Sequence, residues 1–284
     1  MTQHTQSPRD LRIVIIGAGM AGILSAIKLR EAGYHNFIIY EKSDGLGGTW
    51  RENTYPGLAC DVPAHLYTYS FEPNPDWSHV YAPGPEIRIY FENVAKKYGV
   101  MDSIRLREEI ASCEFIDGRW QLRMKSGKTD QADVVIAATG VLHHRNTPDI
   151  PGLSSFRGAC FHSAAWDHCV SLDGKRVGVI GTGSTAIQIT SALVNRVAKF
   201  KLFQRTPQWV LKLPNREYDA NERSTFAKDT TKIQALRQEL DQFFGIFSAA
   251  VIDAESLQMK QIEADCLANL EETVKDPILR EKLR

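Results

Sequence analysis

Short runs of branched apolar residues recur along the chain and predict buried strands. Leu11 to Ile16 is the first run, Asn36 to Tyr40 the second and Asp133 to Gly140 a third. Runs of this length without polar alternation are typical of parallel strands that are covered on both faces. Between the first two runs, Ala21 to Ala32 has the composition of a helix, which Gly33 ends. The order strand, helix, strand within about thirty residues predicts a βαβ unit.

The same order repeats further along the chain. Lys175 to Ile180 predicts a buried strand, Ser184 to Val194 a helix, and Lys199 to Gln204 a second strand. We therefore expect two βαβ units and an α/β fold.

The segments between and after these units have a different character. Asp44 to Pro85 is rich in glycine, proline and aromatic residues, and a loop of that length inside a compact domain is usually functional. Glu86 to Tyr98 predicts a helix, Ile104 to Thr129 predicts antiparallel strands, and His143 to Pro151 predicts a linker. Asn215 to Asp276 lacks proline and contains one glycine, which favours a block of helices with solvated charged faces.

A glycine fingerprint opens the helix of each βαβ unit. The first has glycines at Gly17, Gly19 and Gly22, and Glu41 follows the second strand. The glycines allow a tight turn, close approach of the backbone to a pyrophosphate and close packing of the helix on the strand, while the helix N-terminus faces the phosphates. An acid at the position of Glu41 accepts hydrogen bonds from ribose hydroxyls. The alternative is a tight strand-to-helix turn that holds no ligand.

The second fingerprint runs from Gly181 to Ala186 and is followed by a residue of opposite charge. Arg205 lies as far beyond its last position as Glu41 lies beyond the first fingerprint, and Thr206 comes next. A guanidinium pairs with a 2′-phosphate through two parallel hydrogen bonds, and the hydroxyl adds a donor. The alternative is that Arg205 is a solvated charge at the end of a strand. Together the fingerprints predict one dinucleotide without a 2′-phosphate and one with it. FAD and NADPH are the simplest pair of cofactors that meets both requirements.

Bulk composition argues against several other classes. The 284 residues are 43% hydrophobic and 24% charged, and 34 basic residues balance 34 acidic ones, so the charge does not favour nucleic acid or an anionic membrane as a partner. No apolar run reaches the ~18 residues that a membrane span needs. Residues 1–10 are polar, so no signal peptide is expected. The five cysteines are scattered without a CxxC pair, which favours a reducing cytoplasmic setting over a disulfide framework or a metal site.

Two further groups of motifs resemble those of a known protein family. Phe156 to Asp167 fits FxGxxxHxxxW followed by Pro or Asp, with His162 and Trp166 at its fixed positions. The sequence GGTW at 47–50 is followed by YPG at 55–57 and then by an aspartate, and TG at 139–140 and QRTP at 204–207 come later. In this order the motifs resemble those of Baeyer–Villiger monooxygenases, class B flavoproteins that insert an oxygen atom beside a ketone. Trp166 favours this family over the related N- or S-hydroxylating flavin monooxygenases, which usually have another aromatic residue there.

The resemblance implies roles for individual residues. Gly47 and Gly48 would let the backbone approach the flavin, and Asp61 resembles the carboxylate that orients an arginine near the flavin peroxide. For His162 a structural or gating role is favoured over direct proton transfer. The expected catalytic residues are Asp61, His162 and Trp166. The expected cofactor-binding residues are Gly17, Gly19, Gly22, Glu41, Thr49, Trp50, Arg51, Glu52, Ala59, Cys60, Asp61, Tyr67, Ile110, Gly140, Gly181, Thr182, Gly183, Ser184, Thr185, Ala186, Ile187, Gln188, Arg205 and Thr206.

The implied reaction is oxygen insertion into a small-molecule ketone. NADPH would deliver a hydride to FAD, and the reduced flavin would react with O2 to give a C4a-peroxyflavin. Attack on the ketone carbonyl and migration would then give an ester or lactone.

The chain is shorter than members of the resembled family. We expect residues 1–145 to be the N-terminal part of the FAD-binding domain, 146–214 a linker with the NADPH-binding Rossmann region, and 215–284 a helical insertion of the NADPH domain. The arginine that pairs with Asp61 is expected beyond residue 284. Two further hypotheses follow: an inactive truncated remnant, or one subunit of a split enzyme in which a second chain supplies the C-terminal part.

Overall fold

The computed structural model describes residues 10–284 and divides them into two compact units. The first unit contains the described residues up to Thr54 together with Gly84–Trp166. The second contains Tyr55–Pro83 and Asp167–Arg284. Apart from Asp10, the polar segment from which no signal peptide is expected lies outside the described residues.

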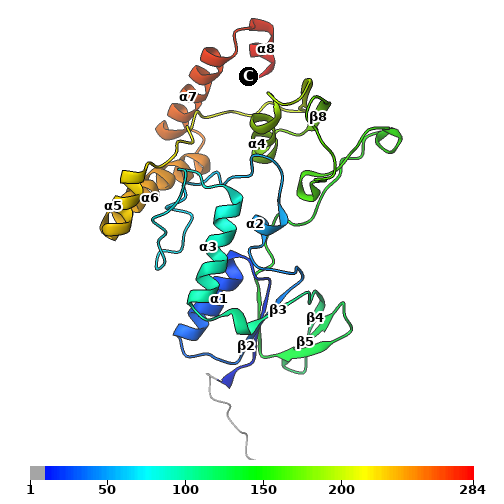
Figure 1. Ribbon diagram of the computed structural model, residues 1–284, viewed down its shortest axis with the longest axis vertical. Coiled ribbons are helices and arrows are strands. Elements are labelled where there is room, and N and C mark those ends of the chain that lie inside the picture. Colours follow the sequence, from blue (N-terminus) through cyan, green and yellow to red (C-terminus); the bar gives the residue numbers. More distant parts are fainter. Residues whose placement is uncertain (1–9) are drawn as a thin grey trace, which may run out of the picture. The chain divides into compact units, whose positions relative to one another are not determined.

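A parallel sheet forms the centre of the first unit. Its strand order is β3-β2-β1-β7, and all three pairs are parallel. The strands are β1 (Ile13–Ile16), β2 (Phe37–Glu41), β3 (Ile104–Leu106) and β7 (Val134–Ala137). Helix α1 (Met20–Glu31) contacts β1, β2 and the longer helix α3 (Gly84–Lys97), and Figure 1 shows the two helices running beside each other. The first βαβ unit predicted from the apolar runs is therefore confirmed.

The central strand β1 is buried on both faces because a second sheet covers one of them. Strands β4 (Ile110–Ile116), β5 (Arg119–Met124) and β6 (Thr129–Ala132) form an antiparallel sheet in that order. Val14 of β1 belongs to one buried cluster with Leu122 and Met124 of this sheet. Its neighbours Ile13 and Ile15, whose side chains point the opposite way, are buried as well.

The first unit also contains short helical elements outside these sheets. They are the four-residue helix α2 (Thr49–Glu52) and the 3-10 turns η2 (Met101–Ser103), η3 (Leu153–Ser155) and η4 (Ser163–Ala165). Residues 141–152 contain no strand or helix, which agrees with the predicted linker.

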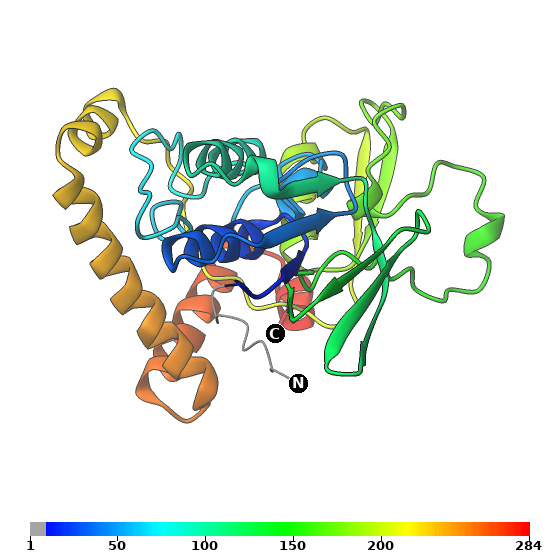
Figure 2. The same cartoon turned by 90° about the horizontal axis from the view of Figure 1, so that it is seen from below.

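The second unit contains the second βαβ unit and a block of helices. Strands β8 (Arg176–Ile180) and β9 (Lys199–Phe203) pair in parallel, and α4 (Ser184–Leu193) connects them and contacts β9. Four helices follow, namely α5 (Ala220–Lys228), α6 (Thr230–Ile252), α7 (Leu257–Thr273) and α8 (Pro277–Lys282). Figure 2 shows α6 and α7 as an antiparallel hairpin, and the two helices contact each other.

Local capping residues explain where these helices begin. Asp219 forms a capping box with Glu222 at the start of α5, and the side chains of Asp229, Ser256 and Asp276 accept backbone N–H groups at the starts of α6, α7 and α8. The predicted helical block is thus confirmed. No helix among residues 10–284 is long and apolar enough to cross a bilayer.

The segment Tyr55–Pro83 folds with the second unit, although it lies between elements of the first unit in the sequence. Its backbone pairs with residues near 215: Val80 donates to the carbonyl of Arg216, and Tyr218 donates to that of Ser78. The domain boundaries expected from the sequence place this segment with the first fingerprint, and their functional meaning stays a prediction.

Candidate functional site

The first fingerprint forms a turn that only glycine fits. Gly17 has φ +102°, and its N–H donates to the carbonyl of Tyr40 at 2.8 Å. A Cβ at Gly17 would lie 2.5 Å from the carbonyl oxygen of Ala138, and a Cβ at Gly22 would lie 1.9 Å from that of Gly17. Gly19 precedes α1 as its N-cap. The turn therefore brings bare backbone N–H groups to the N-terminus of α1, where anions bind favourably.

Glu41 is buried beside this turn, with 6% of its surface exposed. Its Oε2 accepts the N–H of Ala18 at 2.7 Å and its Oε1 accepts the N–H of Ser43 at 2.8 Å. A carboxylate oxygen can accept more than one hydrogen bond. These contacts therefore orient the carboxylate and leave it able to accept further hydrogen bonds. This is the arrangement that the prediction of a ribose-binding acid requires.

A second pair of glycines packs against the fingerprint. Gly48 has φ +52°, and a Cβ there would lie 3.1 Å from the Cα of Gly19. The N–H of Gly47 donates to the carbonyl of Ala18 at 3.2 Å. Helix α2, which consists of the predicted residues Thr49, Trp50, Arg51 and Glu52, starts directly after this contact.

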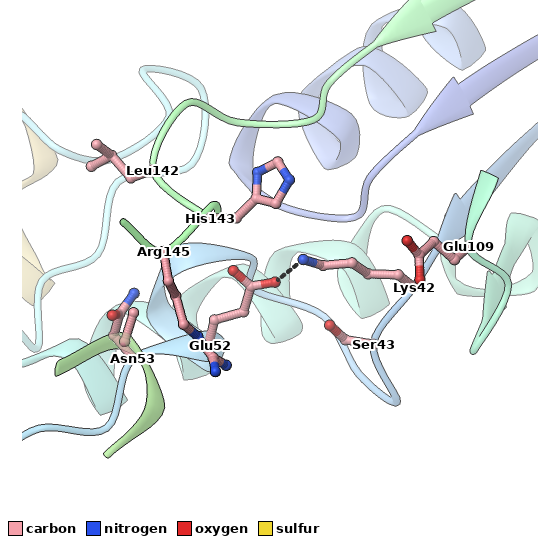
Figure 3. A pocket seen from close by; sticks show the side chains of 9 residues that line it. Lys42, Ser43, Glu52, Asn53, Glu109, Leu142, His143 and Arg145 are labelled. Carbon is pink, nitrogen blue, oxygen red and sulfur yellow. Dashed lines mark ion pairs between the residues drawn. The ribbon is translucent and has the colours of Figure 1, made fainter. Parts of the chain in front are cut away.

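A polar cavity of about 310 Å³ lies at the same end of the sheet (Figure 3). It is lined by Lys42, Ser43, Glu52, Asn53, Glu109, Leu142, His143, Arg145 and Ala164. Lys42 and Glu52 form an ion pair of 2.9 Å within it. The cavity includes one predicted residue, Glu52, and its lining residues Lys42 and Glu109 are the sequence neighbours of Glu41 and Ile110.

The remaining predicted residues of the first unit lie near strand ends or in the linker. Gly140 follows β7 with φ +72°. His162 is the N-cap of η4, and its Nδ1 accepts the N–H of Ala164 at 3.1 Å. The ring of Trp166 contacts that of Phe161 edge to face, with 5.1 Å between centroids. The imidazole of His162 thus orders the local turn, which fits the structural role favoured for it.

The second fingerprint repeats the geometry of the first. Gly181 has φ +112°, and its N–H donates to the carbonyl of Phe203 at 2.9 Å. Gly183 is the N-cap of α4 in the same extended conformation that Gly19 has before α1. Ala186 replaces the third glycine and is buried.

The backbone register identifies a residue that sequence spacing missed. Gly17 bonds to Tyr40, the residue before Glu41, whereas Gly181 bonds to Phe203, the residue before Gln204. The strand pairs agree, since Ile16 faces Tyr40 and Ile180 faces Phe203. Gln204 is therefore the counterpart of Glu41, and the exposed Arg205 and Thr206 follow it. Counting along the chain from either the first glycine or the last fingerprint position gives Arg205, which lies one residue beyond the counterpart that the register shows.

The segment with the predicted residues Ala59, Cys60 and Asp61 lies against α4 within the second unit. Ser184 Oγ donates to Asp61 Oδ2 at 3.0 Å, and Gln188 Nε2 donates to the carbonyl of Ala59 at 2.9 Å. Burial raises the pKa of the Cys60 thiol to about 11, so this thiol stays protonated at neutral pH. The structure thus brings Asp61 to the first turn of the helix that opens with the second fingerprint.

An arginine from the helical block clamps the next part of that segment. Arg237 of α6 donates to the carbonyl oxygens of His65 and Thr68 and to the Thr68 hydroxyl. Tyr67, predicted to contact a cofactor, lies between these anchor points and is half-buried. Nothing in the sequence pattern singled out Arg237 or His65.

No cluster of His, Cys, Asp and Glu side chains that could hold a metal ion occurs among residues 10–284.

Comparison with known proteins agrees with this picture. A family model described as flavin-binding monooxygenase-like matches residues 10–242. An uncharacterized monooxygenase of Mycobacterium tuberculosis is 45% identical over 95% of this chain and 54% of its own length. A Baeyer-Villiger monooxygenase of Streptomyces coelicolor is 39% identical over 100% of this chain and 54% of its own length. The chain therefore spans about half the length of these curated relatives.

Solved structures resemble the chain over nearly all of its length. Cyclohexanone monooxygenase from Rhodococcus sp. Phi1 bound to NADP+ matches with a TM-score of 0.80 and 30% identity, covering 96% of this chain and 59% of that one. Oxidized steroid monooxygenase bound to NADP matches with a TM-score of 0.81 and 29% identity, covering 96% and 59%. The expected fold, two Rossmann-like regions with a helical block, is confirmed by these matches.

Proposed function

Because the chain belongs to the flavin-binding monooxygenase-like family, we propose that it binds FAD at the first fingerprint and NADPH at the second. We further propose that the whole protein uses these cofactors for a Baeyer–Villiger oxidation, in which one oxygen atom of O2 is inserted beside a ketone carbonyl to give an ester or lactone. The observation that carries the proposal is the pair of similar fingerprint turns, one followed by a buried acid and the other by Gln204 and Arg205.

The residues of the first unit fit a flavin dinucleotide. Gly17 and Gly22 leave no room for a Cβ, so backbone N–H groups come as close to a pyrophosphate as possible. Glu41 is held by two N–H groups at the end of β2, where it would accept ribose hydroxyls. The polar cavity lined by Lys42, Glu52 and Glu109 would take the adenosine end.

The residues of the second unit fit a phosphorylated dinucleotide. Gly181 and Gly183 repeat the turn, and among residues 10–284 no atom outside the adjacent residues would lie within 4 Å of a Cβ at either position, which leaves space for a ligand. Gln204 is neutral where Glu41 is charged, so it would not repel a 2′-phosphate. Arg205 and Thr206 would supply the donors to that phosphate.

Bound FAD and NADPH would supply the hydride transfer and the oxygen activation, and the chain would supply binding, orientation and electrostatics. Ser184 holds Asp61 by a hydrogen bond at the first turn of α4, where the carboxylate would meet the nicotinamide nucleotide. His162 orders the η4 turn before Trp166, which supports a structural rather than a proton-transferring role.

Titration of the purified chain with FAD and with NADP+ tests the proposal. We expect stoichiometric FAD binding with a yellow spectrum, and NADP+ binding that is about tenfold or more weaker in Arg205→Ala, whereas NAD+ binding changes little. Arg176→Ala, at an exposed position at the start of β8, is the matched control. Equal loss of both nucleotides in Arg205→Ala would refute the 2′-phosphate site.

Substrate assays separate the Baeyer–Villiger reaction from hydroxylation. NADPH-dependent formation of an ester or lactone from a ketone supports the proposal, and oxidation of amines and sulfides without reaction of ketones would show an N- or S-hydroxylating enzyme instead.

The proposed partners beyond the ketone and O2 include a second polypeptide. It would correspond to the part of the relatives that the match does not span, and it would bring an arginine to Asp61. Turnover only after addition of that part of a relative supports this partner, and turnover by the chain alone contradicts it. A cytoplasmic location is proposed because all five cysteines are free thiols.

A further inference from the structure

Helix α4 holds the segment Tyr55–Asp61 through side chains one turn apart. Ser184 Oγ donates to Asp61 Oδ2 at 3.0 Å. Gln188 Oε1 accepts the hydroxyl of Tyr55 at 2.8 Å, and Gln188 Nε2 donates to the carbonyl of Ala59 at 2.9 Å. Residues four apart on a helix lie on the same face, so these contacts form one continuous attachment.

Both polar atoms of the Gln188 side-chain amide form hydrogen bonds with this segment. The resemblance counts Gln188 among the cofactor-binding residues, but its oxygen and its nitrogen both have partners in the segment. Tyr55 is buried, with 8% of its surface exposed, so its hydroxyl needs a partner inside the protein. Burial raises the pKa of Tyr55, which keeps this hydroxyl a donor.

The backbone of the segment also comes directly against the helix. Gly57 has φ +82°, and a Cβ there would lie 2.5 Å from the carbonyl oxygen of Gln188. The absence of a side chain at Gly57 therefore permits the close approach at which the Gln188 side chain reaches both Tyr55 and Ala59.

We propose that Gln188 is a positioning residue that fixes the segment Tyr55–Asp61 on α4 and so holds the Asp61 carboxylate at the dinucleotide-binding turn. The inference rests on the proposed NADPH site and adds the residue that places Asp61 within it. Gln188 acts through Tyr55 and Ala59 rather than by contact with the cofactor.

The remainder of segment 55–83 has separate anchors. Ala64 donates to the carbonyl of Val80, and Val80 donates to that of Arg216. Arg237 holds the carbonyls of His65 and Thr68. Cys60 shares these anchors, since its N–H donates to the carbonyl of Ala82. Loss of the Gln188 contacts therefore loosens residues 55–59 and leaves residues 64–82 in place.

Hydrogen exchange of the full chain without nucleotide tests this separation. In Gln188→Leu we expect amides of residues 57–59 to exchange about tenfold or more faster, because their attachment to α4 is lost, while amides of residues 64–82 keep their rates. Ser191→Ala is the matched control, since Ser191 is exposed on the same helix and its hydroxyl donates to the carbonyl of Ile187. Unchanged exchange at 57–59, or equal acceleration throughout 55–83, would overturn the proposal.

A double-mutant cycle on NADP+ affinity tests the positioning of Asp61. We expect Asp61→Asn to change the Kd for NADP+ several-fold in the wild-type background and to have a smaller effect in the Gln188→Leu background, because Asp61 is then held at the site by Ser184 alone. Additive effects, or a wild-type Kd in Asp61→Asn, would contradict the inference. If the wild-type chain binds no NADP+, the proposed function fails, and the exchange measurement alone decides the role of Gln188.

Discussion

Glu41 at the end of β2 accepts the backbone N–H of Ala18 in the first fingerprint through a 2.7 Å hydrogen bond that is buried from solvent. The contact joins the strand that delivers the acid to the turn that would receive a pyrophosphate. The geometry of the turn and the orientation of the carboxylate are consequently fixed together, before any ligand is present.

Replacement of Glu41 by glutamine is expected to weaken both folding and FAD binding. The amide has one acceptor oxygen in place of two, so either Ala18 or Ser43 loses its partner, at a cost of about 1–3 kcal/mol in the free energy of unfolding. FAD affinity is expected to fall about tenfold or more, measured by titration and by chemical denaturation. Glu31→Gln, at a half-exposed ion pair on α1, is the control. Wild-type values for both quantities in Glu41→Gln would contradict the assignment of this carboxylate.

The two fingerprints are expected to tolerate an added methyl group differently. Gly22→Ala places a Cβ 1.9 Å from the carbonyl oxygen of Gly17, so the helix must move away from the strand. We expect a loss of about 1–3 kcal/mol in the free energy of unfolding, together with weaker FAD binding.

Gly183→Ala provides the comparison for that substitution. Gly183 has φ −70°, and among residues 10–284 no atom outside the adjacent residues lies within 4 Å of an added Cβ. The thermal unfolding of Gly183→Ala is therefore expected to match that of the wild type, while NADP+ binding weakens. A melting temperature for Gly22→Ala as high as that of Gly183→Ala would show that the first turn relaxes freely.

An acid at position 204 is expected to reverse the preference for the nucleotide. Gln204 is the register counterpart of Glu41, so Gln204→Glu places a carboxylate where it accepts ribose hydroxyls and repels a 2′-phosphate. We expect NADP+ affinity to fall about tenfold and NAD+ affinity to hold or rise. Gln208→Glu makes the same charge change at an exposed position nearby. An equal loss of NADP+ affinity in both variants would show that the added negative charge acts at long range and not at the position of the 2′-phosphate.

The buried imidazole of His65 is expected to make stability depend on pH. It is 1% exposed, lies edge-on to the rings of Tyr218 and Phe226, and neither ring nitrogen has a hydrogen-bond partner among residues 10–284. Burial, followed by the charge of Arg237, lowers the pKa of His65 to about 4.

Because the unfolded chain binds a proton near pH 6.5 and the folded chain only near pH 4, stability is full above pH 6.5 and is lost progressively as the pH falls to about 4. The loss attributable to His65 is about 3 kcal/mol over this range. His65→Phe is expected to flatten this part of the stability curve, measured by denaturation at several pH values, whereas His35→Gln, at an exposed site, is not. An unchanged slope in His65→Phe would assign the pH dependence to other groups.

The sequence by itself determined the local architecture. The apolar runs of β1 and β2, the glycines at their ends and the capping residues of the last helices act through neighbours in the chain, so each could be read without a fold. The charges of Glu41 and Arg205 indicated the two kinds of dinucleotide, and the spaced motifs indicated the family, which the comparisons confirmed.

The tertiary structure decided the relationships between distant segments. Gln204 became the counterpart of Glu41 only through the pairing of β8 with β9, because counting along the chain cannot show which residues face each other. The attachment of Tyr55 and Asp61 to α4, and of His65 to Arg237, joins residues more than a hundred positions apart. Such contacts depend on burial and on the packing of whole elements, and no local pattern encodes them.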